Sequence, residues 1–247
     1  MKSQNISSSK KKIALDKFDE ENFSENRTEV SEILNQVGKI NVGWNLSYLK
    51  TLPSIDTIID VGSADDFSVL HNAFPEAYSI LIDPNVMFED TYKKYLKTRR
   101  GEYHLCALSD KSYLDKFFFY PDKPYLSTLI KRSDVGNLKY EEKEINVKKL
   151  DNLIDYDNIK KNVLLKIDAE GNEIKILKGS SKLLDICKIV ICECSLDDNF
   201  PGGYTFSEIY NILNNKEFKL KDVIRVPRKE FNAFPAEVLD VVFVKNL

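Results

Sequence analysis

Two stretches of the chain place acidic side chains and a glycine directly after an apolar run. Leu164–Gly171 (LLKIDAEG) ends on Asp168 and Glu170, and the earlier stretch TIIDVGSADD places Asp60 and Gly62 in the same way. If both apolar runs are parallel strands, their carboxyl ends share one edge of a sheet, and open α/β sheets bind ligands at that edge. The two stretches therefore predict one ligand site.

The earlier stretch has features of a nucleotide-like cofactor site. Gly62 in the turn lets a ligand approach the backbone, and the N-terminus of a following helix offers unpaired N–H groups. Asp83 ends the next strand, ILIDPN, at about the 20-residue distance at which doubly wound folds place an acidic residue on ribose hydroxyls. Taken alone, Asp83 is better explained as an ordinary turn carboxylate before Pro84, but together with Asp60 and Gly62 it favours a cofactor.

The glycine pattern distinguishes between cofactors. A dinucleotide fold uses G-x-G-x-x-G to seat a pyrophosphate, whereas Gly62 is followed by Ser63, Ala64, Asp65 and Asp66. Acidic side chains repel a pyrophosphate and attract a cofactor that carries a sulfonium and an amino group. The loop therefore predicts S-adenosylmethionine rather than NAD.

The later stretch supplies candidates for a general base. A carboxyl group beside another carboxylate has a raised pKa, which helps it accept a proton at neutral pH, so Asp168 is the first candidate and Glu170 the second. The alternative is that Asp168 caps the following helix and Glu170 stabilises its positive end. Glu193 could complete a divalent metal site with Asp168, and metal use is left open. His104 lies on a predicted strand, where a lone histidine is more often packed than catalytic.

Size and charge limit the class of protein. With 247 residues, 43% of them hydrophobic, the chain can bury the core of one large α/β domain. The net charge is −3, and lysine and arginine are spread along the chain. This distribution does not predict binding to a nucleic-acid backbone.

The distribution of apolar residues and the positions of the cysteines predict the same cellular compartment. No stretch approaches the roughly 20 apolar residues of a membrane span, and the N-terminus lacks the apolar core of a signal peptide, so we expect a cytoplasmic protein. The cysteines lie in apolar, strand-like runs, and their spacing matches no common zinc pattern. We therefore expect buried free thiols at Cys106, Cys187, Cys192 and Cys194.

Strand-like and helical patterns alternate along the chain, which predicts a mainly parallel sheet with helices on both faces. Only Pro227–Pro235 separates the last two strands, so they are expected to form an antiparallel hairpin. The predicted strands are Thr57–Val61, Tyr78–Ile82, Glu102–Ala107, Val163–Ile167, Ile186–Cys194, Phe218–Ile224 and Leu239–Lys245, and the predicted helices are Phe67–Ala73, Met87–Lys97, Glu173–Leu184 and Thr205–Asn215.

Composition suggests three parts. Residues 1–25 are too polar to bury much surface and are predicted to be a flexible tail. Residues 26–54 are predicted to be a helical appendage, because apolar positions in Ser24–Val37 recur at helical spacing. Residues 55–247 are predicted to form the main domain, with an inserted hairpin near 111–149 that we call the insert.

The aromatic residues of the insert suit either a flap that faces substrate or a surface hairpin that packs on the core. Trp44 likewise suits core packing or a wall of the acceptor site.

Six short blocks follow one another along the second part of the chain. They are DVGSADD, ILIDPN, CALSD, LDNLI, LLKIDAEGNEIKILKG and VICEC. Together and in this order they resemble the FkbM-type class I methyltransferases. The resemblance runs from about Ile55 to the C-terminus and implies a Rossmann-like, seven-stranded, mainly parallel sheet with an antiparallel C-terminal strand. It also implies S-adenosylmethionine-dependent O-methylation, frequently of sugars in glycans or of natural products.

The resemblance also implies roles for particular residues, although the chain departs from the family pattern at Ala64 and Asp66. A non-catalytic scaffold that has kept the fold is therefore the alternative, and the acceptor, a hydroxyl or an amine, is left open, as is the oligomeric state. The implied cofactor residues are Asp60, Gly62 and Ser63 for the methionyl part, Asp83 for the ribose, and Ala107 and Leu108 for the adenine, with Asp168 and Glu170 facing the transferred methyl group.

Overall fold

The computed structural model describes residues 44, 46–65, 67–132, 136–196, 204–225 and 238–245. The chain divides into two units, Met1–Val42 and Gly43–Leu247, and the first lies outside the described residues. The predicted tail, the helix predicted within Ser24–Val37, and Asp66 fall outside them as well. The domain limits drawn from the sequence therefore stay predictions.

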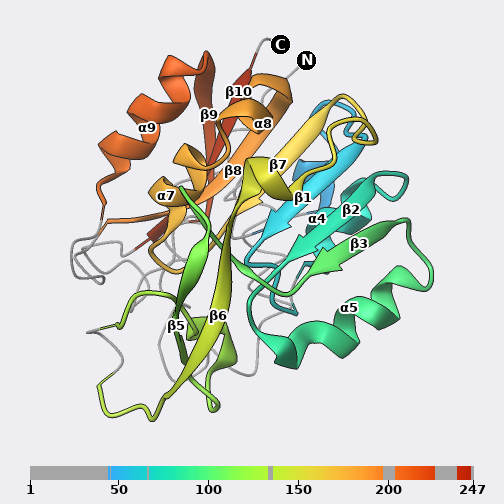
Figure 1. Cartoon of the computed structure of the whole chain (residues 1–247). Coiled ribbons are helices and arrows are strands. Elements are labelled where there is room, and N and C mark those ends of the chain that lie inside the picture. The colour runs from blue at the N-terminus through green and yellow to red at the C-terminus, as the bar shows by residue number, and fades with distance from the viewer. Residues whose placement is uncertain are drawn as a thin grey trace, which may run out of the picture. The chain divides into compact units, whose positions relative to one another are not determined.

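A seven-stranded sheet forms the centre of the second unit, in the order β3-β2-β1-β7-β8-β10-β9 (Figure 1). Neighbours from β3 to β8 are parallel, and β10 is antiparallel to both β8 and β9. This arrangement confirms the predicted fold class and the antiparallel pairing of the last two strands. The strands are β1 (Thr57–Val61), β2 (Tyr78–Ile82), β3 (Gly101–His104), β7 (Val163–Ile167), β8 (Cys187–Ser195), β9 (Phe218–Arg225) and β10 (Val238–Lys245).

Helices cover both faces of this sheet, which explains why its central strands read as continuous apolar runs. One face packs against α6, α7, α8 and α9, and the other against α3 and α4, while α5 and the short η2 cover a third cluster beside β2. The helices are α3 (Leu46–Leu49), α4 (Ser68–Ala73), η2 (Val86–Phe88), α5 (Glu89–Leu96), α6 (Leu150–Leu153), α7 (Glu173–Lys178), α8 (Ser181–Ile186) and α9 (Phe206–Asn215).

A second sheet has three strands in the order β4-β6-β5. The predicted strand Glu102–Ala107 is wrong in one respect, because it is divided between the two sheets. β3 ends at His104, and the chain re-enters a strand at Ala107 to pair with β6, not β2. The elements of this region are β4 (Ala107–Ser109), β5 (Tyr113–Phe119), the short η3 (Pro124–Leu126) and β6 (Glu141–Lys149).

The predicted helix Glu173–Leu184 is also divided, into α7 and α8. The break falls at Gly179, where an added Cβ would lie 2.2 Å from the carbonyl oxygen of Ser109. The new helix starts where the Asp151 carboxylate accepts hydrogen bonds from the backbone N–H groups of Lys182 and Leu183, both at 3.0 Å. Contacts with β4 and α6, distant in sequence, thus end one helix and begin the next.

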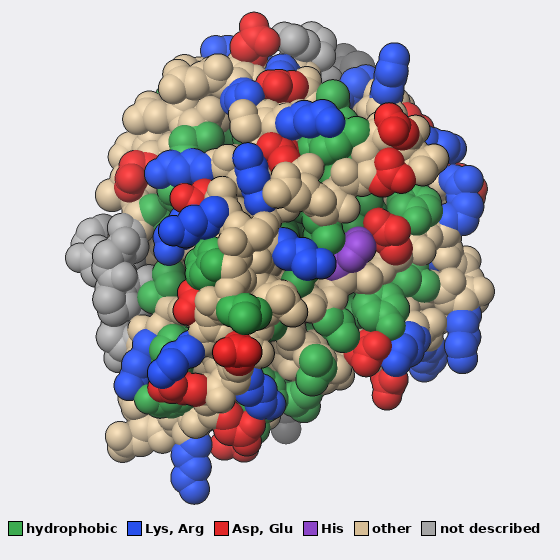
Figure 2. All heavy atoms as spheres, in the orientation of Figure 1, with side chains coloured by type: hydrophobic (Ala, Val, Ile, Leu, Met, Phe, Trp, Pro, Cys, Tyr) green, Lys and Arg blue, Asp and Glu red, His purple; other side chains and the backbone are tan. Residues whose placement is uncertain are grey.

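The surface and the cysteines add three observations. Acidic and basic side chains are interspersed on the face shown in Figure 2. Among the described residues, no helix has the length and apolar character needed to cross a membrane. All four cysteines are buried free thiols, as the sequence predicts.

Candidate active site

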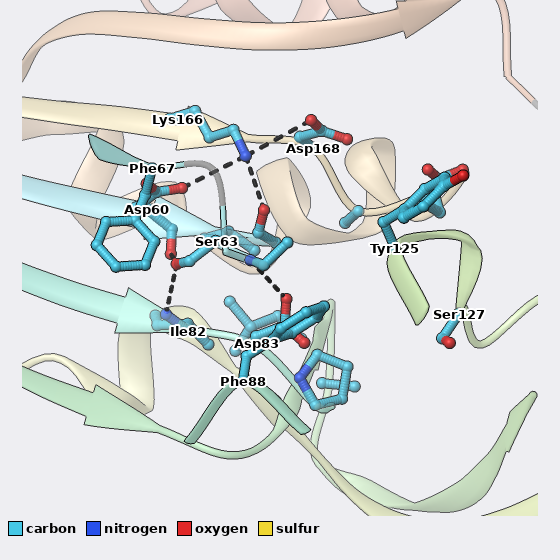
Figure 3. Close-up of a pocket in the computed structure, with 18 of the residues that line it drawn as sticks. Asp60, Ser63, Phe67, Ile82, Asp83, Phe88, Tyr125, Ser127, Lys166 and Asp168 are labelled. Atoms are coloured by element: carbon cyan, nitrogen blue, oxygen red, sulfur yellow. Dashed lines mark hydrogen bonds and ion pairs between the residues drawn. The ribbon is translucent and has the colours of Figure 1, made fainter. Parts of the chain in front are cut away.

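All eight residues predicted to bind cofactor or catalyse line a single cavity of about 670 Å³. The cavity lies at the carboxyl ends of β1, β2 and β7, where the connections leave the sheet (Figure 3). Parallel strands bring these ends to one edge, so residues more than a hundred positions apart become neighbours. The structure therefore brings the predicted residues together, while their individual roles stay predictions.

Gly62 is required by the protein's own backbone. Its φ is +69°, and an added Cβ would lie 1.6 Å from the carbonyl oxygen of Asp168. The sequence suggested that this glycine leaves room for a ligand. In the structure, the missing side chain first lets the turn after β1 pack against the end of β7.

Replacing Gly62 by alanine is expected to lower the free energy of unfolding by about 2–3 kcal/mol, from the positive φ and the overpacked contact. Urea denaturation measures this loss. Gly136→Ala is the matched control, since Gly136 has a φ of +57° but nothing within 4 Å of an added Cβ. An equal loss in the two variants would show that the Asp168 contact is unimportant.

Lys166 joins the two halves of the cavity, and sequence reasoning missed it. Its Nζ donates to the carbonyl oxygen of Gly62 at 2.7 Å and lies 3.4 Å from Asp60 Oδ1 and 3.5 Å from Asp168 Oδ2 (Figure 3). Burial would lower the pKa of Lys166, but the charges of Asp60 and Asp168 more than offset this and raise it. The signal in the sequence was one lysine within an otherwise apolar strand.

Asp60 is fully buried and held from two sides. His71 Nε2 lies 3.1 Å from its Oδ2, and the other ring nitrogen of His71 lies 2.9 Å from Ser79 Oγ. Burial raises the pKa of Asp60, but Lys166 and His71 offset that effect and bring the pKa below its usual range. Asp60 is thus held as a carboxylate at the floor of the cavity.

Asp83 and Ser63 form the adjoining side of the cavity. Asp83 Oδ1 accepts from the Asn85 N–H at 2.7 Å, and Oδ2 accepts from the Ala64 N–H at 3.1 Å. Burial raises the pKa of Asp83 to about 6, against the effect of these hydrogen bonds. The Ser63 hydroxyl donates to the Asp60 carbonyl oxygen at 2.6 Å and accepts from the Ile82 N–H at 3.2 Å, so it holds the loop in place.

Asp168 faces the cavity and does not cap α7. The N–H groups of Ala169 and Gly171 before this helix donate instead to Glu173 Oε1, at 2.8 and 3.3 Å. The Asp168 side chain is 29% exposed. This geometry leaves Asp168 available to a ligand, which favours the catalytic interpretation over the capping one.

Glu170 is near Asp168 but is engaged elsewhere. Its carboxylate pairs with Arg132, and its carbonyl oxygen accepts a hydrogen bond from Thr128 Oγ1 at 2.7 Å. Burial and the charge of Asp168 raise the pKa of Glu170 to about 8, while Arg132 acts in the opposite direction. Sequence reasoning did not identify Arg132, which comes from the insert.

The carboxylates of three acidic residues lie close to one another, as the ligands of a metal ion do. Ligand atoms of Asp168, Glu170 and Glu193 lie within 4.8 Å of one another. Two of these residues already face a cation, Lys166 for Asp168 and Arg132 for Glu170. The cluster is therefore partly neutralised by the chain itself, and metal use stays open.

The insert lines the cavity as well as packing on the core. Phe117 and Phe119 are buried, while Tyr125 is 57% exposed and lines the cavity. In Figure 3, Tyr125 and Ser127 lie across the cavity from Asp60. Part of the insert thus packs on the core and part lines the cavity, and a flap that faces substrate stays a prediction.

Trp44 and the residues predicted to lie beside adenine also line the cavity. Trp44 Nε1 donates to Asp240 Oδ2 at 2.8 Å, and its ring packs against the core beside α3. Ala107 and Leu108 are buried, and the Leu108 carbonyl oxygen accepts from Asn172 Nδ2 at 2.6 Å. These contacts hold the start of β4 against the site.

Comparisons with known proteins place the chain in a family. The model of the methyltransferase FkbM domain matches residues 60–220, more than half of the chain. A search of curated proteins found no match.

Several solved structures are similar to this one at low sequence identity. An FkbM methyltransferase from Methylobacillus flagellatus KT is 12% identical, with a TM-score of 0.48 over 77% of this chain and 43% of that one. Magnesium protoporphyrin IX methyltransferase from Synechocystis PCC 6803, with bound S-adenosylmethionine, is 11% identical, with a TM-score of 0.44 over 99% of this chain and 100% of that one.

The present chain thus spans 43% of the length of the FkbM methyltransferase from Methylobacillus. The family match itself covers the strand ends and loops that build the cavity, from Asp60 to β9. The chain belongs to the FkbM family of methyltransferases.

Proposed function

We propose that the chain transfers a methyl group from S-adenosylmethionine to a hydroxyl group of a small molecule or glycan, most simply a sugar. The observation that carries the proposal is the single cavity in which Asp60 and Asp83 lie on one side and Asp168 on the other. Its volume of about 670 Å³ is in the range of sites for small molecules and cofactors.

The residues present fit this cofactor. Each carboxylate oxygen of Asp83 takes one backbone N–H, which leaves acceptor capacity on both oxygens for a ribose diol. Asp60 Oδ1 is buried and accepts no hydrogen bond from the described residues, although Lys166 lies 3.4 Å away. The lining contains more carboxylates than cations, which favours a ligand that carries a sulfonium.

When bound, S-adenosylmethionine supplies an electrophilic methyl group on its sulfonium. The chain contributes alignment and a base. Asp168 accepts the proton of the acceptor hydroxyl, because an alcohol with a high pKa is a poor nucleophile. Lys166, held by Gly62 and Asp60, orients the Asp168 carboxylate. The insert excludes water from the opposite side, and alignment of this kind can supply several kcal/mol.

Affinity for the cofactor is expected to depend on pH through Asp83. Ribose hydroxyls donate to the ionised carboxylate, so binding favours that form, and the pKa of Asp83 is about 6. S-adenosylhomocysteine should therefore bind with constant affinity above about pH 7 and weaken by up to about 10-fold at pH 5. Isothermal titration across this range measures the effect. Asp83→Asn should remove the pH dependence, and a profile that is equally steep in this variant would contradict the assignment.

The proposed function is tested by titration of the purified chain with S-adenosylmethionine, S-adenosylhomocysteine and NADH. Micromolar binding of the first two and not of NADH, lost in Asp83→Ala, supports a methyltransferase. A panel of sugars and other alcohols, with release of S-adenosylhomocysteine as the readout, then identifies the acceptor. Binding of neither adenosyl compound would favour the non-catalytic scaffold.

A further inference from the structure

One segment of the insert crosses the mouth of the cavity. We call Pro124–Arg132 the strap. At one end, Asn85 Nδ2, beyond the end of β2, donates to the Pro124 carbonyl oxygen at 3.2 Å. At the other end, Thr128 Oγ1 donates to the Glu170 carbonyl oxygen at 2.7 Å, beyond the end of β7. Residues between these two points line the cavity, so the strap roofs it from β2 to β7.

Glu170 holds the strap through both its backbone and its side chain. Its carbonyl oxygen takes the Thr128 hydroxyl, and its carboxylate pairs with Arg132, whose side chain is 9% exposed. The φ of Glu170 is +52°, an unfavourable conformation for a residue with a side chain, and such a conformation persists only where surrounding contacts maintain it. The strap supplies two of those contacts.

Thr128 is the central contact inside the strap. Its hydroxyl also accepts a hydrogen bond from the Ile130 N–H at 3.2 Å. Its backbone pairs with Phe118 in both directions, at 2.9 and 3.2 Å, and this joins the strap to β5. Loss of the Glu170 contacts would thus free residues 129–132 of the strap and leave Thr128 held by its backbone pair with β5.

We propose that Glu170 is a positioning residue that fastens the strap over the cavity, and that bound cofactor exchanges with solution when this fastening opens. The Arg132 guanidinium already occupies the Glu170 carboxylate, whereas Asp168 faces the cavity with a partly exposed side chain. The two acidic residues after β7 therefore have different tasks. The exchange of cofactor rests on the proposed function, whereas the fastening of the strap by Glu170 does not.

Hydrogen exchange of the protein without cofactor tests the fastening. Arg132→Gln, Glu170→Gln and Thr128→Val should each accelerate exchange of the amides of residues 126–129 by about 10-fold or more, because charge-assisted or buried hydrogen bonds are lost. Ile130 is left out of the comparison because Thr128→Val removes the acceptor of its own N–H. Arg132→Lys keeps the cation and should restore most of the protection. The matched control is Lys116→Gln, which breaks the exposed Lys116–Glu142 pair of the same insert and should change nothing. Unaltered protection in the first three variants would overturn the proposal.

Exchange of the cofactor product tests the consequence. Trp44 is the only tryptophan of the chain and lines the cavity, so its fluorescence can follow binding of S-adenosylhomocysteine in stopped flow. Association and dissociation rates should both rise about 5–10-fold in Arg132→Gln, with Kd changed less than about 3-fold, as expected when a barrier and not a contact is lost. The double variant Glu170→Gln with Arg132→Gln should resemble either single one, since the two residues act as a pair.

The results separate the two proposals. Unchanged rates in these variants, or a loss of affinity through dissociation alone, would overturn the link between the strap and exchange. Methyl transfer abolished by Glu170→Gln but kept in Arg132→Gln, with equal exchange rates, would make Glu170 the base and overturn its positioning role. If the unmodified protein binds neither adenosyl compound, the proposed function fails, while hydrogen exchange still decides whether Glu170 fastens the strap.

Discussion

Asp168→Asn is expected to lower kcat for methyl transfer by about 10²–10⁴-fold, the usual contribution of a general base. The carboxylate faces the cavity, 3.5 Å from Lys166, and the amide that replaces it cannot accept the proton of the acceptor. Affinity for S-adenosylhomocysteine should change by less than about 3-fold, because the lost interaction belongs to the acceptor step. Steady-state kinetics and calorimetry on the same preparation measure the two quantities.

Asp122→Asn is the control for this substitution, since Asp122 is exposed in the turn before η3 and does not line the cavity. It should leave both quantities unchanged. A kcat for Asp168→Asn within a few-fold of the unmodified enzyme would show that Asp168 is not the base. Glu193, which lines the cavity near Asp168, would then be the next carboxylate to replace.

Asp83→Asn is expected to weaken S-adenosylmethionine and S-adenosylhomocysteine equally, by about 10²-fold. The carboxylate can accept a hydrogen bond from each hydroxyl of the ribose diol, whereas the amide has one acceptor oxygen, and hydrogen bonds to charged groups are worth about 1.5–3 kcal/mol each. The equal loss follows because both compounds carry the same ribose. Calorimetric titration measures it.

The unfolding temperature of Asp83→Asn checks that its loss of cofactor affinity comes from the ribose contact and not from a damaged fold. The folded pKa of Asp83, about 6, lies above its ordinary value of 3.8, so the ionised carboxyl destabilises the fold above that pH. Removing the charge favours the fold at pH 7, whereas the amide can accept from only one of the Ala64 and Asn85 N–H groups. The two effects oppose each other, so the unfolding temperature should fall by no more than a few degrees. Asp90→Asn, which is exposed in α5 and does not line the cavity, should leave the affinity unchanged. A similar loss in both variants would indicate a general charge effect and not a ribose contact.

Local sequence was sufficient for the framework of the site. β1, β2 and β7 agree residue for residue with the predicted strands, because strands buried on both faces must be apolar throughout and are easily recognised. Once these strands are parallel, their carboxyl ends meet, and Asp60, Asp83 and Asp168 have to converge. The convergence followed from strand direction alone, without knowledge of any side-chain contact.

Contacts between segments distant in the sequence decided the features that local sequence did not predict. Gly179 ends α7 because the Ser109 carbonyl oxygen lies against it, and helical periodicity carries no trace of that neighbour. Likewise, the sequence places Asp168 and Glu170 after the same strand and ranks them as first and second candidates for the base. It gives no sign that the folded insert brings Arg132 to Glu170. The sequence by itself determined which strands deliver carboxylates to the cavity, since strand periodicity is local. The tertiary structure decided that Glu170 pairs with Arg132 of the insert and that Asp168 lies beside Lys166 with its side chain partly exposed, since a partner is set by proximity in space.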